Sequence, residues 1–179
     1  MPKKTFSKED YNSPDGMLTT IWGPPMWHSL HTISFNYPVK PTKEDKINYY
    51  NYFNSLQRIL PCKYCRDNLS LNYKKLPFSK KVFKDRETLS KFVYDLHEMV
   101  NKRLGKKSNL TYTQVRERYE GFRARCLDSK PSKIEKGCTT SLYGVKGKCV
   151  MDIVPKDSTR KSLNIHSKCK VKKKTNKIN

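Results

Sequence analysis

Helical periodicity runs through residues 22–126 of this 179-residue chain. Apolar residues recur there at intervals of three and four, the spacing of one face of an α-helix, and no segment alternates convincingly like a strand. The spacing predicts five helices, over residues 22–36, 43–60, 62–73, 85–104 and 111–125, the fourth of which begins at Asp85 or at Thr88. We therefore expect an all-α fold for this part of the chain.

Local signals mark where these helices begin and end. Pro24 and Pro25 fit near the first turn of the first helix, where a missing N–H costs little. Thr42 can cap the second helix, and Gly105 is a natural residue just after the fourth. The tetrapeptide Thr111-Tyr112-Thr113-Gln114 has the pattern of a capping box, which predicts the start of the fifth helix.

The rest of the chain differs in composition. Residues 1–20 are polar and are expected to form a flexible N-terminal lead-in to a helical domain over residues 21–126. Residues 127–154 contain glycines and two cysteines and predict a loop-rich extension, with one short strand within residues 148–154. Residues 155–179 carry nine Lys or Arg against one acidic residue, which predicts a basic disordered tail.

The net charge of +22 has two readings. One is a solvated, lysine-rich surface, and the other is a nucleic-acid interface. We favour the first, because the charge is spread widely and no base-reading motif accompanies it. No apolar run approaches the roughly 20 residues that a membrane-spanning helix needs, and residues 1–6 lack an apolar signal core. We expect a soluble, intracellular protein that binds no specific nucleic acid.

Cys62 and Cys65 form a C-x-x-C pair directly after Pro61. The proline places them at a helix N-terminus, which favours the reactive thiolate form of cysteine. Zinc is the alternative, but it needs two or more further ligands, and the remaining cysteines are distant single residues. A redox pair would also explain six cysteines in an intracellular chain, so we expect no metal site.

Two further pairs of residues indicate a cofactor site. Trp27 and His31 are separated by four positions, as are His97 and Asn101, so each pair shares one face of its helix. Helix bundles build cofactor sites from side chains on facing helices in this way. Lys102 is expected to point about 100° away from Asn101 on a 3.6-residue turn. Each histidine alone fits a structural role, but together they favour a cofactor near the cysteine pair.

In five motifs, residues 22–126 resemble the ERV/ALR family of FAD-linked sulfhydryl oxidases. The motifs are Trp22-Gly23-Pro24-x-x-Trp27-x-x-Leu30-His31, Tyr37-Pro38, Pro61-Cys62-x-x-Cys65, His97-x-x-Val100-Asn101 and Leu104-Gly105-Lys106. The resemblance implies a four-helix bundle with a short fifth helix, which binds FAD and forms a homodimer. The cysteine-containing stretch at residues 137–155 resembles versions from large DNA viruses, which implies a place in the host cytoplasm or the virion.

The resemblance also implies roles for individual residues. Cys65 would lie against the isoalloxazine ring, with Tyr112 or Tyr119 as a further wall. The residues that would line the flavin are Gly23, Trp27, His31 and Tyr37. Those that would hold the adenine, ribose and diphosphate are His97, Val100, Asn101 and Lys106. The chain departs from the family at Glu98, where Asn is common, and it has no cysteine between positions 65 and 126 for a common structural disulfide.

The implied reaction transfers electrons from thiol-containing substrate proteins through Cys62 and Cys65 to FAD and then to molecular oxygen, which yields hydrogen peroxide. Two other functions stay open, a zinc-stabilised interaction module and a basic nucleic-acid-binding protein. Cys138 and Cys149 flank a loop that contains glycine, and form either a structural disulfide or a shuttle pair that relays electrons to Cys62. The pairing of these two cysteines with Cys126 and Cys169 is left open.

Overall fold

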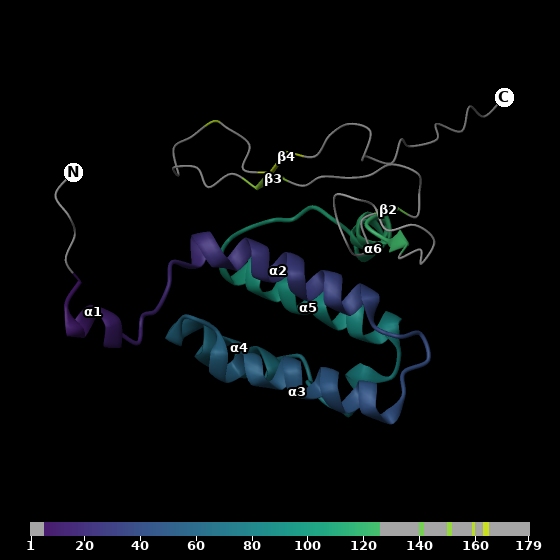
Figure 1. Ribbon diagram of the computed structural model, residues 1–179, viewed down its shortest axis with the longest axis horizontal. Helices are drawn as coiled ribbons and strands as arrows, with labels where there is room; N and C mark the ends of the chain where they lie inside the picture. The colour runs from purple at the N-terminus through teal and green to yellow at the C-terminus, as the bar shows by residue number, and fades with distance from the viewer. Residues whose placement is uncertain (1–5, 126–139, 142–149, 152–158, 160–162, 165–179) are drawn as a thin grey trace, which may run out of the picture. The chain divides into compact units, whose positions relative to one another are not determined.

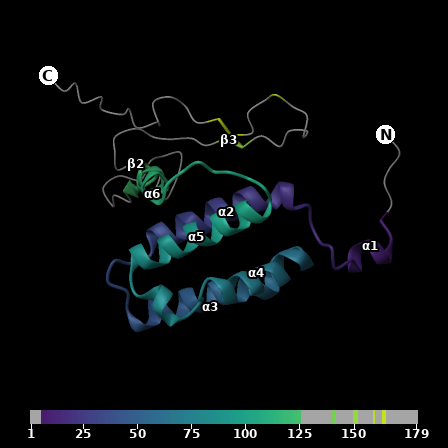
Figure 2. The ribbon, with the colours of Figure 1, turned by 180° about the vertical axis from the view of Figure 1, so that it is seen from behind.

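The computed structural model describes residues 6–125, 140–141, 150–151, 159 and 163–164 (Figure 1). The chain divides into two compact units, residues 1–112 and 113–179. The first unit contains α1 (Lys8–Asn12), α2 (Thr19–Asn36), α3 (Lys43–Ile59), α4 (Lys63–Lys75), the 3₁₀ helix η1 (Lys80–Phe83) and α5 (Arg86–Arg103). Among these elements α2 packs against α5 and α3 against α4, and the two pairs form two layers in both views (Figures 1 and 2).

One hydrophobic core joins the four long helices of the first unit. Its buried members come from α2, α3, α4, α5, η1 and the turns beside them: Leu30, Tyr37, Phe53, Leu56, Leu60, Leu69, Tyr73, Val82, Phe83, Leu89, Phe92, Val93 and Leu96. Aromatic rings fill much of it, and Phe78 stacks on Tyr73 with ring centroids 4.2 Å apart. The helical fold predicted from periodicity is confirmed, because one face of each long helix contributes to this core.

Helix α6 (Tyr112–Glu120) begins at the boundary between the units. It ends at Glu120, before Gly121, and not near residue 125 as predicted. The strand β1 (Ala124–Arg125) follows and pairs antiparallel with β2 (Thr140–Ser141), with Ala124 opposite Ser141. Two more short strands, β3 (Val150–Met151) and β4 (Leu163–Asn164), form a second antiparallel pair.

The predicted caps are present where the sequence signal was local. Thr42 and Asp45 form a complete capping box at the start of α3. The carboxylate of Asp85 accepts the backbone N–H of Thr88 at 2.8 Å and so caps α5. After α5, Gly105 adopts a φ of 66°, the left-handed conformation that favours glycine just after a helix.

The start of α2 differs from the prediction. The helix begins at Thr19, because the carbonyl of Leu18 accepts the N–H groups of Ile21 and Trp22. Pro24 and Pro25 therefore lie in the second turn and not in the first. Proline in that turn leaves carbonyl groups of the first turn without a helical N–H partner.

The N-terminal lead-in contains a helix that the sequence analysis did not place. Ser7 and Asp10 form a reciprocal capping box at the start of α1. The predicted strand at residues 148–154 coincides with β3 at Val150 and Met151. The remaining expectations for residues 126–139, 142–149, 152–158, 160–162 and 165–179, which include the Cys138–Cys149 pair and most of the predicted tail, lie outside the described residues. Within residues 155–179, where a disordered tail was predicted, the structure describes the strand β4. Among the residues described, no helix is both long and apolar enough to span a membrane.

Candidate active site

The C-x-x-C pair lies at the first turn of α4, as the sequence predicted. Cys62 is the N-cap residue, and its Sγ accepts the backbone N–H of Cys65 at 3.3 Å. Both residues are free thiols in this structure. The N–H groups of this turn therefore point toward the sulfur of Cys62, which is the arrangement that favours a negative charge there.

The two cysteines differ in their surroundings. Cys65 is half-buried and packs against the hydrophobic core, whereas Cys62 is only 6% exposed but is not a member of that core. Burial, together with the hydrogen bond and the charge of Cys62, raises the pKa of Cys65 to about 12. The helix N-terminus was expected to favour the thiolate form of the pair, but for Cys65 in the reduced pair burial acts in the opposite direction and raises the pKa.

An aromatic cluster lies between α2 and α5. The rings of Trp27 and His97 are stacked, with centroids 4.1 Å apart and planes within 5°. Nε2 of His31 and Nδ1 of His97 are 3.0 Å apart and share a hydrogen bond. The structure therefore brings together three of the four residues in the two predicted i, i+4 pairs.

The two imidazoles of this cluster are neutral. Burial, assisted by the charges of His97 and His28, lowers the pKa of His31 to about 3. The pKa of His97 falls to about 4, mainly through burial, with Glu98 raising it and Lys106 lowering it. Uncharged imidazoles and an indole thus form a weakly polar aromatic cluster, the kind of surroundings that suit a planar aromatic ligand.

Asn101, the fourth of these residues, has a different contact. Its side-chain amide donates to the carboxylate of Glu98 at 3.0 Å. Its backbone carbonyl accepts the N–H of Lys106 at 2.9 Å, so it fixes the turn that follows α5. Glu98, the departure from the family pattern, therefore contacts a predicted ligand residue directly.

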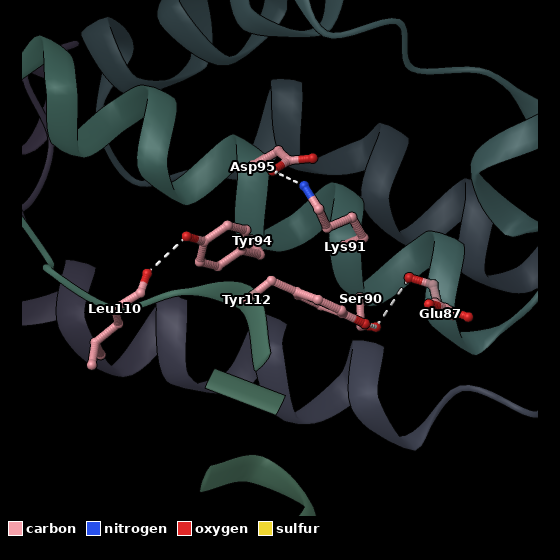
Figure 3. Close-up of polar contacts among 7 residues, drawn as sticks. All are labelled: Glu87, Ser90, Lys91, Tyr94, Asp95, Leu110 and Tyr112. Atoms are coloured by element: carbon pink, nitrogen blue, oxygen red, sulfur yellow. Dashed lines mark hydrogen bonds and ion pairs between the residues drawn. The ribbon is translucent and has the colours of Figure 1, made fainter. Parts of the chain in front are cut away.

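A pocket of about 510 Å³ opens beside the C-terminal end of α5. Lining residues come from α5 and from the segment after it: Tyr94, Glu98, Lys102, Gly105, Lys106, Lys107, Ser108, Asn109, Leu110 and Thr111. Tyr94 closes one side by donating its hydroxyl to the carbonyl of Leu110 at 2.7 Å (Figure 3). Three lysines in one pocket suit an anionic ligand such as a diphosphate.

Sequence reasoning found only part of this pocket. Lys106 was predicted, whereas Lys102, which was expected to point away from Asn101, was not named as a site residue; Lys102 lines the pocket and Asn101 does not. Tyr94 and Lys107 were also missed. Position 94 precedes Glu98 by four residues on α5, and the lysines cluster around Gly105, so both signals were present in the sequence.

The other predicted site residues occupy varied positions. Tyr37 is fully buried in the core, where its hydroxyl donates to the carbonyl of Phe83 at 2.9 Å, so the structure does not bring it to the Trp27–His97 stack. A Cβ on Gly23 would meet no atom within 4 Å, which leaves open space beside α2. Val100 is half-buried on α5.

Of the two tyrosines expected as a further wall, Tyr112 belongs to the first unit. Its hydroxyl lies 2.9 Å from Ser90 Oγ (Figure 3). Its ring stacks on Phe35, with centroids 6.2 Å apart. Tyr119 belongs to the second unit. No cluster of three or more His, Cys, Asp or Glu residues that could bind a metal occurs in the described part of the chain.

Comparison with known proteins identifies relatives of this chain. The family described as Erv1 / Alr matches residues 24–120. A probable FAD-linked sulfhydryl oxidase of Acanthamoeba polyphaga mimivirus is 41% identical over 99 residues, which are 55% of this chain and 68% of that protein. A putative FAD-linked sulfhydryl oxidase of Invertebrate iridescent virus 6 is 30% identical over 90 residues, 48% of this chain and 81% of that protein.

Solved structures agree on the fold. The crystal structure of the yeast Erv1 core superposes with a TM-score of 0.52 at 23% identity, over 66% of this chain and 92% of that one. A double cysteine-to-serine mutant of Erv1 from Saccharomyces cerevisiae gives a TM-score of 0.54 at 22% identity, over 69% and 98% of the two chains. Because the family match covers more than half of the sequence and includes the cysteine pair, this chain belongs to the Erv1 / Alr family.

Proposed function

We propose that this protein is an FAD-dependent sulfhydryl oxidase that forms disulfide bonds in substrate proteins. The observation that carries the proposal is a C-x-x-C pair capping α4 in a chain of the Erv1 / Alr family. The two viral relatives are named FAD-linked sulfhydryl oxidases, which agrees with a thiol oxidase activity. A zinc-stabilised module or a nucleic-acid-binding protein has no comparable support.

The residues present fit FAD. The neutral stack of Trp27 and His97, with His31 beside it, offers a flat surface for a ring system. The pocket that contains Lys106 offers cations for a diphosphate. On this proposal the cofactor is held by Gly23, Trp27, His31, His97, Val100, Asn101 and Lys106, whereas Tyr37, the other residue that the resemblance implies, is buried in the core. When bound, FAD accepts two electrons from the reduced cysteine pair and passes them to molecular oxygen.

The two cysteines have separate tasks in this reaction. In the oxidised pair, a substrate thiolate attacks Sγ of Cys62, the Cys62–Cys65 bond breaks, and Cys65 leaves with the electron pair. A second substrate thiol then displaces Cys62, which releases the substrate disulfide and the reduced pair. Burial against the core keeps Cys65 protonated in that pair, so it must lose a proton before it can be reoxidised.

The finer points of this function are also proposals. Residues 21–126 would form the FAD-binding domain, with residues 127–154 as an extension and 155–179 as a basic tail. We propose a homodimer, with thiol-containing viral proteins as substrates in the host cytoplasm or the virion. Support for the viral setting comes from the relatives in mimivirus and in an iridescent virus.

Oxygen consumption with dithiothreitol tests the proposal. The purified full chain should be yellow, with a flavin absorbance spectrum, and Cys62→Ser and Cys65→Ser should each abolish turnover while the flavin stays bound. Cys169→Ser is the matched control, because it removes a thiol outside the pair and should keep the activity. A colourless wild-type protein, or a serine variant of the pair with wild-type turnover, would rule out this function.

A further inference from the structure

The N-terminal segment contacts both sides of Cys62. The backbone N–H of Lys63 donates to the carbonyl of Pro14 at 3.2 Å. The N–H of Met17 donates to the carbonyl of Pro61 at 2.7 Å. Residues 14–17, here called the strap, are therefore bound to the residue before Cys62 and to the residue after it.

Gly16 is the residue that lets the strap come this close. It adopts a φ of 73°, a conformation that side chains disfavour. A Cβ at this position would lie 2.2 Å from the carbonyl oxygen of Pro61 and 3.2 Å from Cα of Cys62. Both of these are backbone atoms, so neither can move aside as a flexible side chain would. Only glycine fits at this position of the strap, next to the backbone of Pro61 and Cys62.

The strap also connects the pair to α2. Nε1 of Trp22 donates to the carbonyl of Met17 at 2.8 Å, and the Trp22 ring packs against the hydrophobic core. This bond holds the end of the strap against the helix that carries Trp27 and His31. The position of the strap is therefore fixed at three points, of which two flank Cys62 and one lies on α2.

Burial of Cys62 follows from this arrangement. The residue is only 6% exposed, although it does not belong to the hydrophobic core that covers Cys65. The strap lies directly against its backbone, at the distances given above. The strap is thus bound to the backbone on both sides of a buried Cys62, whereas Cys65 packs against the hydrophobic core.

We propose that the strap shields Cys62 from thiol reagents and holds it in place within the redox pair, with Gly16 as its positioning residue. This inference rests on the proposed function, in which Cys62 is the sulfur that substrate thiols attack. An incoming thiolate then reaches Cys62 only when the strap moves or when the substrate fits beside it. The strap thus limits which thiols enter the reaction.

Alkylation of the reduced full chain tests this proposal. The anaerobic protein is treated with iodoacetamide, and the rate at each cysteine is followed by mass spectrometry. Gly16→Ala should raise the rate at Cys62 roughly tenfold, as expected when two backbone hydrogen bonds that hold the strap are lost. The rate at Cys65 should change far less, because the core covers it. Gly16→Asn should act like Gly16→Ala, since asparagine tolerates a positive φ but still adds the Cβ.

Gly105→Ala is the matched control for backbone strain. Gly105 has a φ of 66°, and a Cβ there would meet nothing within 4 Å. The control should leave the rate at Cys62 unchanged. Two results would overturn the proposal. One is an unchanged alkylation rate at Cys62 in Gly16→Ala. The other is an equal rise in rate at Cys62 and Cys65, because that would indicate a general loosening of the fold.

Trp22→Phe keeps the test decisive if the Gly16 variants do not fold. It removes the hydrogen bond to Met17 without adding an atom, and should raise the rate at Cys62 roughly threefold, as for one lost hydrogen bond. No change at Cys62 in this variant would overturn the proposal. The measurement needs neither flavin nor oxygen, so a chain that shields Cys62 but lacks oxidase activity would refute the proposed function and leave the strap in place.

Discussion

Acid should destabilise this protein through the buried pair His31 and His97. His31 is 3% exposed, and its Nε2 shares a hydrogen bond with Nδ1 of His97. A bond between two neutral imidazoles needs one ring to donate and the other to accept. When both rings are protonated, all four nitrogens are donors and this bond is lost. The folded protein therefore keeps both rings neutral at about pH 5, while the unfolded chain takes up protons below about pH 6.5, so lowering the pH from about 7 to about 5 is the perturbation to apply.

The sign follows from the direction of the pKa shifts. Folding lowers the pKa of His31 from 6.5 to about 3 and that of His97 from 6.5 to about 4. The stability from these shifts is present above pH 6.5, and it is lost as the pH falls toward the folded-state values, because the unfolded chain binds more protons. At about pH 5 each residue accounts for a loss of about 2 kcal/mol at most, so the pair accounts for about 2 to 4 kcal/mol.

Urea unfolding followed by circular dichroism measures this loss. The free energy of unfolding should fall steadily between about pH 7 and about pH 5, and His31→Gln should remove about half of the slope. The matched control is His28→Gln, a change at an exposed histidine on the same helix, which should keep the slope. Carboxylates with lowered pKa values, such as Asp45 and Asp85, do not contribute in this range, because their ordinary pKa is 3.8.

Two results would refute this reasoning. The first is a free energy of unfolding that stays constant between about pH 7 and about pH 5, which would mean that the two histidines are not buried as neutral rings. The second is an unchanged slope in His31→Gln, which would assign the acid sensitivity to other groups. Because bound flavin adds its own stabilisation, the comparison is made on chains with equal flavin content.

Two other predictions concern the cofactor and the remaining cysteines. His97→Ala and Asn101→Ala should each lower the amount of flavin retained after gel filtration, whereas the control Lys74→Ala on α4 should not. Equal flavin retention in all three variants would show that α5 does not contribute to the flavin site. Replacing Cys138 and Cys149 with serine separates a structural disulfide from a shuttle. Loss of a shuttle should slow the oxidation of a protein substrate but leave the oxidation of dithiothreitol unchanged. Loss of a structural disulfide should lower Tm and leave both activities similar at low temperature. Two free thiols at positions 138 and 149 in unreduced active enzyme would exclude both roles.

The sequence predicted what depends on local chemistry. The capping box at Thr42, the Asp85 cap and the position of Gly105 all follow from residues within one turn of the helix end. The i, i+4 spacing likewise placed Trp27 and His31 on one face, and the stack with His97 forms because α2 packs against α5. Local signals are strong where a few neighbouring residues decide the structure.

Other features depend on contacts between distant segments, which periodicity does not report. In the core, the hydroxyl of Tyr37 donates a hydrogen bond to the carbonyl of Phe83, a residue 46 positions away in the sequence. The pKa of Cys65 is raised because the core desolvates the thiol, an effect that overrides the helix N-terminus on which the prediction relied. Lys102 lines a pocket because the chain turns back after Gly105.

The two cysteines show why a motif alone does not define a site. Cys62 and Cys65 are three positions apart on one helix turn, and their different roles were implied only by the family resemblance and not by their spacing. The fold makes them different, because the hydrophobic core packs against Cys65, whereas residues 14–17 bind the backbone on both sides of Cys62 and, as we propose, shield its thiol. A thiol oxidase needs this difference, since one sulfur must meet substrate and the other must pass electrons onward. The N-terminal segment, which the composition described only as a polar lead-in, therefore supplies half of the asymmetry on which the proposed reaction depends.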